Sequence, residues 1–204
     1  MRKLITTLAL LAAATPALSQ QQATPVDPAT VERTVAATFK SAPPEWAQRI
    51  IQDETQKLCS QYRNALPADV FAQVLAREQS SVVLPADDVV LGDWKAGERV
   101  AQTGTGGQFS DGPTTPKGGN CYACHQLSRA ELSYGTLGPS LLEYGKIRKF
   151  GAADAKAAYA KIYNAQSVLP CSNMPRFGHA RFLTEQQIKD LVALLFDPES
   201  PVNK

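Results

Sequence analysis

Two cysteines and a histidine stand within five consecutive positions, in the segment Cys121-Tyr122-Ala123-Cys124-His125. The 204-residue chain has only four cysteines and two histidines, so this grouping is the first feature to explain. C-x-x-C-H is the attachment pattern of c-type haem. Two thiols at this spacing can each form a thioether with a haem vinyl group, and the next imidazole can then ligate the iron. The motif predicts one covalently bound haem c, with His125 as an axial ligand.

Two other kinds of site use the same residue types. A redox-active dithiol of the thioredoxin kind needs a βαβ context, which the neighbouring sequence does not have. A structural zinc site needs further cysteines or histidines close by. The next such residues, Cys171 and His179, follow only about fifty positions later. Haem attachment is therefore the favoured interpretation.

A second axial ligand is expected from the sequence "NMPRFG". Met174 is the only methionine apart from Met1. It lies in a Pro-, Asn- and Gly-rich loop, which is not where a methionine that fills a core is expected. A thioether opposite histidine raises the haem potential and suits an electron acceptor. His179 is the competing ligand, and a haem enzyme with an open sixth position is the interpretation if Met174 does not ligate. We favour Met174.

A Gly-Pro turn follows the haem motif in "GTLGPSL", residues 135–141. A proximal histidine needs a hydrogen-bond acceptor for its Nδ1 proton, which fixes the tautomer and the ring orientation. The carbonyl of Pro139 is the candidate acceptor for His125. The alternative, an ordinary turn proline, is equally compatible with the sequence.

The first 19 residues predict a cleaved signal peptide. Arg2 and Lys3 precede an apolar run that is too short for a membrane span, and small residues follow at Ala17 and Ser19. No later segment is long and apolar enough to span a membrane either. Without Arg2 and Lys3 the formal charge is 19 basic against 19 acidic residues, which gives no reason to expect nucleic-acid binding. The expected location is the periplasm, where unligated cysteines tend to form disulfides.

Cys59 and Cys171 are the two cysteines that the haem motif does not use. In an oxidising compartment they most simply pair with each other, which would join the N-terminal part of the chain to the loop of Met174. The alternative makes Cys171 a thiolate ligand or a substrate-carrying sulfur and leaves Cys59 as a buried free thiol. We favour the disulfide.

The elements that must position these residues are helical. Asp93 is an N-cap for a helix over 92–102, apolar positions repeat with helical spacing over 152–165, and Thr184 with Gln187 forms a capping box for a terminal helix that ends at Asp197-Pro198. The predicted fold is all-α: a class I cytochrome c domain over 91–204, preceded by an N-terminal helical extension.

The extension, residues 20–90, contains three helix-like segments. Apolar residues recur every four positions after Asp27-Pro28, residues 45–64 read as one amphipathic helix, and 67–76 as a third. Their apolar faces could cap the haem domain, present a surface to another subunit, or do both.

The sequence resembles the SoxX family, the small monohaem subunits of periplasmic SoxAX complexes. The similarity covers roughly 85–204, and the tail and the "GDWKAGE" segment are its most specific parts. It rests on five segments: "LGDWKAGERVA", "CYACH", "GTLGPSL", "NMPRFG" and "LTEQQIKDLVALLFDPESPVNK".

This resemblance implies a function for the complex and a narrower one for the chain. Cys121 and Cys124 would hold the haem, and His125 and Met174 would ligate it. A larger SoxA-type subunit would carry the catalytic haem and couple thiosulfate to a cysteine of a SoxYZ-type carrier protein. The present chain would pass electrons to a small soluble cytochrome c, so the enzymatic activity, that of an L-cysteine S-thiosulfotransferase, belongs to the complex. The alternative is a freestanding periplasmic electron-shuttle cytochrome c, which has no need of the extension.

Basic residues near the predicted haem loops suggest a rim that steers an acidic partner or an anionic substrate. A scattered, solvated set of charges explains the same pattern equally well. The residues are Lys146, Arg148, Lys149, Arg176 and Arg181.

Overall fold

The computed structural model describes residues 24–42 and 44–204, and this part of the chain is helical with no β-strand. The predicted signal peptide lies outside these residues. Within them, no helix has both the length and the apolar character that crossing a membrane requires. The helices are α1 (Pro28–Thr38), α2 (Ala47–Ile50), α3 (Glu54–Gln61), α4 (Ala68–Ser80), α5 (Trp94–Gln102), α6 (Tyr144–Ile147), α7 (Ala152–Tyr163) and α8 (Glu185–Phe196), with short 3₁₀ turns η1 (Pro44–Trp46), η2 (Cys121–Ala123), η3 (Ala165–Ser167) and η4 (Pro201–Asn203).

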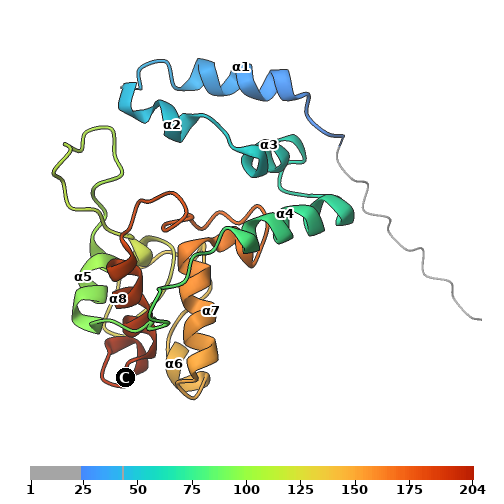
Figure 1. Cartoon of the computed structure of the whole chain (residues 1–204). Helices are drawn as coiled ribbons and strands as arrows, with labels where there is room; N and C mark the ends of the chain where they lie inside the picture. The colour runs from blue at the N-terminus through green and yellow to red at the C-terminus, as the bar shows by residue number, and fades with distance from the viewer. Residues whose placement is uncertain (1–23, 43) are drawn as a thin grey trace, which may run out of the picture.

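The C-terminal part of the chain is built on the crossing of α5 and α8 (Figure 1). A Cβ atom at Gly97 of α5 would lie 2.0 Å from the backbone oxygen of Asp190 in α8, so only glycine lets the two helices approach this closely. Helix α7 packs against the same terminal helix. The buried side chains of α7 and α8 form one continuous core with Tyr122 and Leu127 of the haem-motif region.

Helix ends follow the capping predictions. The carboxylate of Asp93 accepts a hydrogen bond from the backbone N–H of Lys95 at the start of α5. Thr184 and Gln187 form the reciprocal capping box of α8. The C-terminal tail is packed as well, because the side chain of Asn203 caps α6 and donates to carbonyls at the end of α8.

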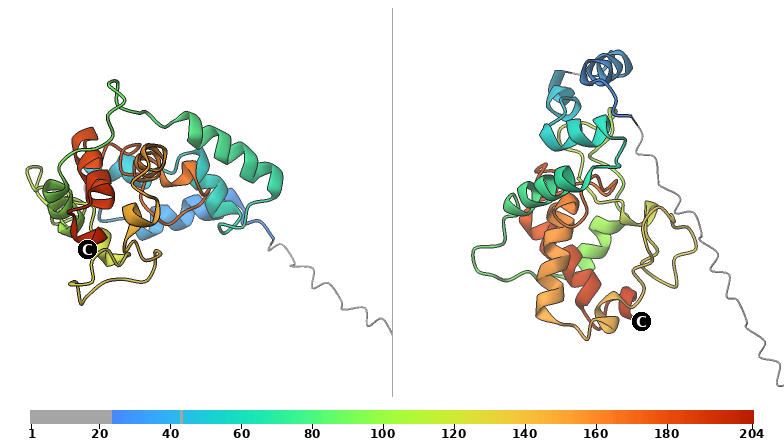
Figure 2. Two further views of the ribbon diagram at one scale, coloured as in Figure 1. Left: turned by 90° about the horizontal axis from the view of Figure 1, so that it is seen from below. Right: turned by 90° about the vertical axis from the view of Figure 1, so that its right-hand side faces the viewer.

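The N-terminal extension contains α1 to α4 and lies across one end of the C-terminal helices, as the different views in Figures 1 and 2 show. The prediction of a single helix over 45–64 is wrong. The chain leaves α2 after Ile50 and restarts at Asp53, whose carboxylate caps α3 in a box with Gln56. A local N-cap therefore divided a segment that hydrophobic spacing alone read as continuous.

Candidate functional site

The haem motif begins with a tight turn. Asn120 has a φ of +47°, a left-handed conformation that asparagine tolerates well, and η2 follows directly. The backbone N–H groups of Cys124 and His125 both donate to the carbonyl of Cys121, at 3.1 Å and 2.8 Å. This single turn brings the two thiols and the imidazole to one short segment, as haem attachment requires.

Both cysteines of the motif are free thiols and half-buried. Burial, with a smaller effect of the neighbouring Cys124, raises the pKa of the Cys121 thiol to about 12. A redox-active dithiol needs a nucleophilic cysteine whose pKa is lowered instead. The environment of Cys121 shows no lowered pKa of the kind that the thioredoxin-like alternative needs.

The segment 135–141 is fastened to the motif by backbone hydrogen bonds. Gly135 N–H donates to Tyr122 O, Gly138 N–H to Cys124 O, and Leu141 N–H to Gln126 O, each at 2.8 Å. Two glycines permit this close approach. A Cβ at Gly135 would lie 1.8 Å from the carbonyl oxygen of Ala123, and one at Gly138 would lie 2.2 Å from His125 Cε1.

This packing places Pro139 O 2.7 Å from His125 Nδ1. The predicted acceptor is therefore the residue that the imidazole meets. Because Nδ1 donates its proton to a carbonyl, the free lone pair of the neutral ring is on Nε2. Nε2 is therefore the nitrogen that can bind a metal.

The Met174 loop, residues 168–184, joins η3 to α8. Met174 is half-buried and packs against the same hydrophobic core as Cys121. Farther along the loop, a Cβ at Gly119 would lie 3.8 Å from Leu183, so the end of the loop also reaches the residues just before the haem motif. His179 is fixed differently. Its backbone N–H donates to Tyr163 O. Burial raises the pKa of the Asp53 carboxyl, but hydrogen bonds from the Gln56 backbone and Arg176, with a smaller effect of His179, outweigh burial and lower that pKa.

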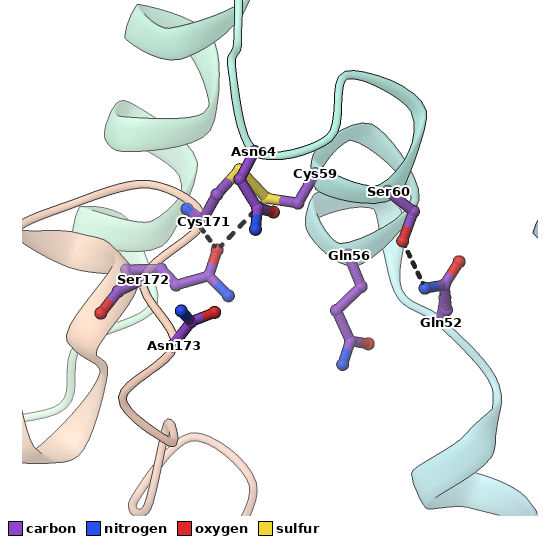
Figure 3. A pocket seen from close by; sticks show the side chains of 9 residues that line it. Gln52, Gln56, Cys59, Ser60, Asn64, Cys171, Ser172 and Asn173 are labelled. Carbon is purple, nitrogen blue, oxygen red and sulfur yellow. Dashed lines mark hydrogen bonds between the residues drawn. A yellow bond between two sulfur atoms is a disulfide. The ribbon is translucent and has the colours of Figure 1, made fainter. Parts of the chain in front are cut away.

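Cys59 and Cys171 form a disulfide, with the Cα atoms 5.4 Å apart. The bond joins α3 to the Met174 loop at a position three residues before Met174, and Figure 3 shows it beside a small cleft lined by amide and hydroxyl side chains. Gln166 Oε1 accepts a hydrogen bond from the backbone N–H of Cys171. Neither sulfur is thus a free thiol in this structure.

Arg176 was expected to be a surface charge, and the structure contradicts that expectation. Its side chain is only 11% exposed and forms ion pairs with Asp53 and Glu78 of the extension. Two others of the proposed rim also have partners, because Lys146 pairs with Glu143 and Arg148 stacks on Tyr144. Arg176 therefore does not belong to an exposed basic rim, whereas Lys146, Lys149 and Arg181 are exposed.

Comparison with known proteins agrees with this geometry. Residues 97–196 match the protein family described as "Cytochrome c". The chain is also similar to an "Uncharacterized lipoprotein" of Aquifex aeolicus (strain VF5), with 41% identity over 155 residues that cover 75% of this chain and 73% of that protein. Residues 97–196 are a cytochrome c domain. The fold is that of an all-α class I cytochrome c, as predicted. Electron transfer through covalently bound haem c is the function that a cytochrome c domain implies.

The residues of the cytochrome c domain fit such a haem. The donor set contains two unpaired thiols at the attachment spacing and one imidazole whose Nδ1 is already occupied by Pro139 O. Glycine at 138 leaves the face of the His125 ring clear of any side chain from that position. Among the described residues, no group of three or more His, Cys, Asp or Glu side chains forms a metal-binding cluster, so nothing here favours the zinc alternative.

Sequence reasoning missed one part of the site, the buried charge at Glu78. The Glu78 residue is 3% exposed, and its carboxylate receives hydrogen bonds from Thr55, Asn164 and Arg176. The sequence places Glu78 four residues after Val74, on the same face of α4, but only the structure shows that this face is buried.

Proposed function

We propose that this chain is the monohaem electron-transfer subunit of a SoxAX-type cytochrome. One haem c would be attached to Cys121 and Cys124, with His125 and Met174 as axial ligands. The hydrogen bond between His125 Nδ1 and Pro139 O is the observation that carries the haem assignment. It fixes the tautomer and the orientation that an imidazole ligand of iron needs.

The bound iron would supply a one-electron couple between its ferric and ferrous states. The chain's own residues would determine how that couple behaves. Pro139 O holds the His125 proton and keeps the imidazole basic, and a Met174 thioether would favour the ferrous state. The core packed around Tyr122, Leu127 and Met174 would keep water from the ligands.

The complex would oxidise thiosulfate outside the cytoplasm. A sulfur–sulfur bond would form between the carrier cysteine and the terminal sulfur of thiosulfate. The cysteine thiol would lose its proton, and two electrons would pass to the cytochromes. A larger SoxA-type subunit would hold the reacting centre, a SoxYZ-type protein would carry the cysteine, and a small soluble cytochrome c would accept the electrons one at a time from this chain. The resemblance of the five sequence segments to the SoxX family and the presence of the helical extension support this assignment.

Export to the periplasm is part of the proposal. The Cys59–Cys171 disulfide supports it, because disulfides persist mainly in oxidising compartments. The description of the Aquifex relative as a lipoprotein is also consistent with export.

Three measurements test the proposal. Haem quantification on the matured protein should give one haem per chain, and loss of either motif cysteine should abolish stable haem attachment. Met174→Ala should remove the red-edge charge-transfer band of Met–Fe(III) and let the ferrous iron bind carbon monoxide, whereas His179→Ala should do neither. Purification from the native organism should recover a larger cytochrome with this chain. Recovery of a lone monomer would favour the freestanding shuttle.

A further inference from the structure

The Met174 loop is attached to the N-terminal extension on both sides of Met174. Cys171, three residues before it, is bonded to Cys59 of α3. Arg176, two residues after it, pairs with Asp53 at the start of α3 and with Glu78 of α4, the latter at 3.3 Å. The first attachment is covalent and the second is a buried ionic one.

The segment between these attachments is short. Two residues separate Cys171 from Met174, and only Pro175, whose ring fixes its φ angle, separates Met174 from Arg176. The N–H of Met174 also donates to Ser172 Oγ at 3.2 Å, which tightens the first half. With both flanks held, the Met174 side chain has little backbone freedom to leave its position.

The ionic attachment is fully satisfied and largely dry. Glu78 Oε1 accepts from Thr55, and Oε2 accepts from Asn164 Nδ2 at 2.7 Å and from Arg176. Asn164 in turn receives the N–H of Gln166 at the start of η3. Among the described residues no buried side-chain nitrogen or oxygen lacks a partner. A buried pair of this kind adds little net stability over an apolar contact, but losing one partner leaves an uncompensated charge. Its contribution is thus to fix which arrangement the loop adopts.

We propose that Glu78, through Arg176, is a positioning residue for the sixth haem ligand. The extension would act as a brace on the Met174 loop, so that dissociation of the thioether from iron requires breaking the Glu78–Arg176 contact or distorting the segment that it holds. This inference rests on the proposed role of Met174 as that ligand.

The test uses the haem-loaded full chain and the variant Glu78→Gln, which keeps the shape of the side chain and removes its charge. The measurement is made at temperatures where the variant has the helix content of the parent protein. We expect carbon monoxide to bind its ferrous form at least about tenfold faster, which corresponds to a free-energy barrier lower by about 1.4 kcal/mol. The Met–Fe(III) charge-transfer band should weaken in parallel. Carbon monoxide binding within twofold of the parent rate, with an unchanged band, would overturn the proposal.

Two control variants separate positioning from other effects. Glu54→Gln removes an exposed carboxylate of α3 that pairs with Lys57 at the surface, and it should leave both readouts unchanged. Val74→Ala weakens the packing of α4 one turn before Glu78 without touching the charges. It should lower the melting temperature while leaving carbon monoxide binding near the parent rate. An acceleration by Val74→Ala equal to that of Glu78→Gln would refute a specific role of the ion pair.

A milder variant covers the case in which Glu78→Gln does not fold. Thr55→Val is nearly isosteric. It removes the hydrogen bond that Thr55 donates to Glu78, together with the two that Arg77 donates to Thr55 Oγ1. It should accelerate carbon monoxide binding about threefold, or about 0.6 kcal/mol. An unchanged rate in that variant would count against the brace. Met174→Ala separates the two proposals. If it leaves the band and the carbon monoxide reaction unaltered, the ligand assignment fails. If it opens the iron while Glu78→Gln does not, only the positioning role fails.

Discussion

Removing the disulfide between Cys59 and Cys171 should cost the folded protein several kcal/mol. The bond connects residues 112 positions apart. The chain-entropy relation for a closed loop of that length gives about 4.8 kcal/mol at 25 °C, arising from the unfolded state, which loses conformations when it is cross-linked. For a chain of this size each kcal/mol corresponds to about 2–4 °C, so the melting temperature should fall by about 10–20 °C.

The assay is thermal unfolding followed by far-ultraviolet circular dichroism on the haem-loaded protein. Ascorbate reduces the iron and leaves the disulfide intact, whereas dithiothreitol reduces both, and thioether bonds to haem survive either reagent. The two samples therefore share the ferrous state and differ only in the disulfide. The Cys59→Ala/Cys171→Ala variant should unfold at the lower temperature with either reductant. A fall of less than about 3 °C on opening the bond would refute the entropic reasoning.

Three further changes have defined outcomes. Gly97→Ala would place a Cβ 2.0 Å from the backbone oxygen of Asp190, so we expect urea denaturation to show a loss of about 1–3 kcal/mol or more. Gly138→Ala would drive a methyl group into the His125 ring, 2.2 Å from Cε1, and should lower the yield of haem-loaded protein. At Glu78, burial raises the pKa, but hydrogen bonds from neighbouring side chains and a nearby guanidinium outweigh burial and leave that pKa below its ordinary 4.5. The carboxylate contributes stability above pH 4.5 and loses it as pH falls through the lower folded value, so acid unfolding of Glu78→Gln should be less steep in that range.

One substitution serves as the control for both glycine changes. A Cβ at Gly112 would meet nothing nearer than Thr115 Oγ1 at 3.9 Å, which is ordinary contact. Gly112→Ala should therefore match the parent in urea denaturation and in haem yield. A comparable defect in Gly112→Ala would show that alanine at any glycine of this chain is harmful, and the steric argument would fail.

Local chemistry made part of the structure predictable from the sequence. The starts of α5 and α8 follow from Asp93 and Thr184, because an N-cap is decided by one side chain and the next few backbone N–H groups. The pairing of Cys59 with Cys171 followed from elimination, since only two cysteines were left once the haem motif was assigned. The helix starts could be predicted from a few neighbouring residues, and the disulfide from the small number of cysteines.

The unpredicted parts depend on contacts between distant segments. Arg176 in its loop and Glu78 in α4 both look like solvated charges, and nothing near either residue in the sequence identifies its partner 98 positions away. Asn164, which donates to Glu78, reads as an ordinary helix-ending residue. Whether a charged side chain is buried depends on which elements pack against each other, and this packing cannot be read from a single sequence.

The two cysteine pairs place opposite demands on the biogenesis of this protein. Cys121 and Cys124 must stay reduced until haem is attached, whereas Cys59 and Cys171 must be oxidised. Four cysteines allow three pairings, and closing the two-residue gap of the haem motif needs no folded structure, while the native bond needs α3 to meet the Met174 loop. In an oxidising compartment the unfolded chain would therefore cross-link its haem motif first. Production of active protein thus depends on a supply of reductant at the haem motif as much as on an oxidant for the native bond.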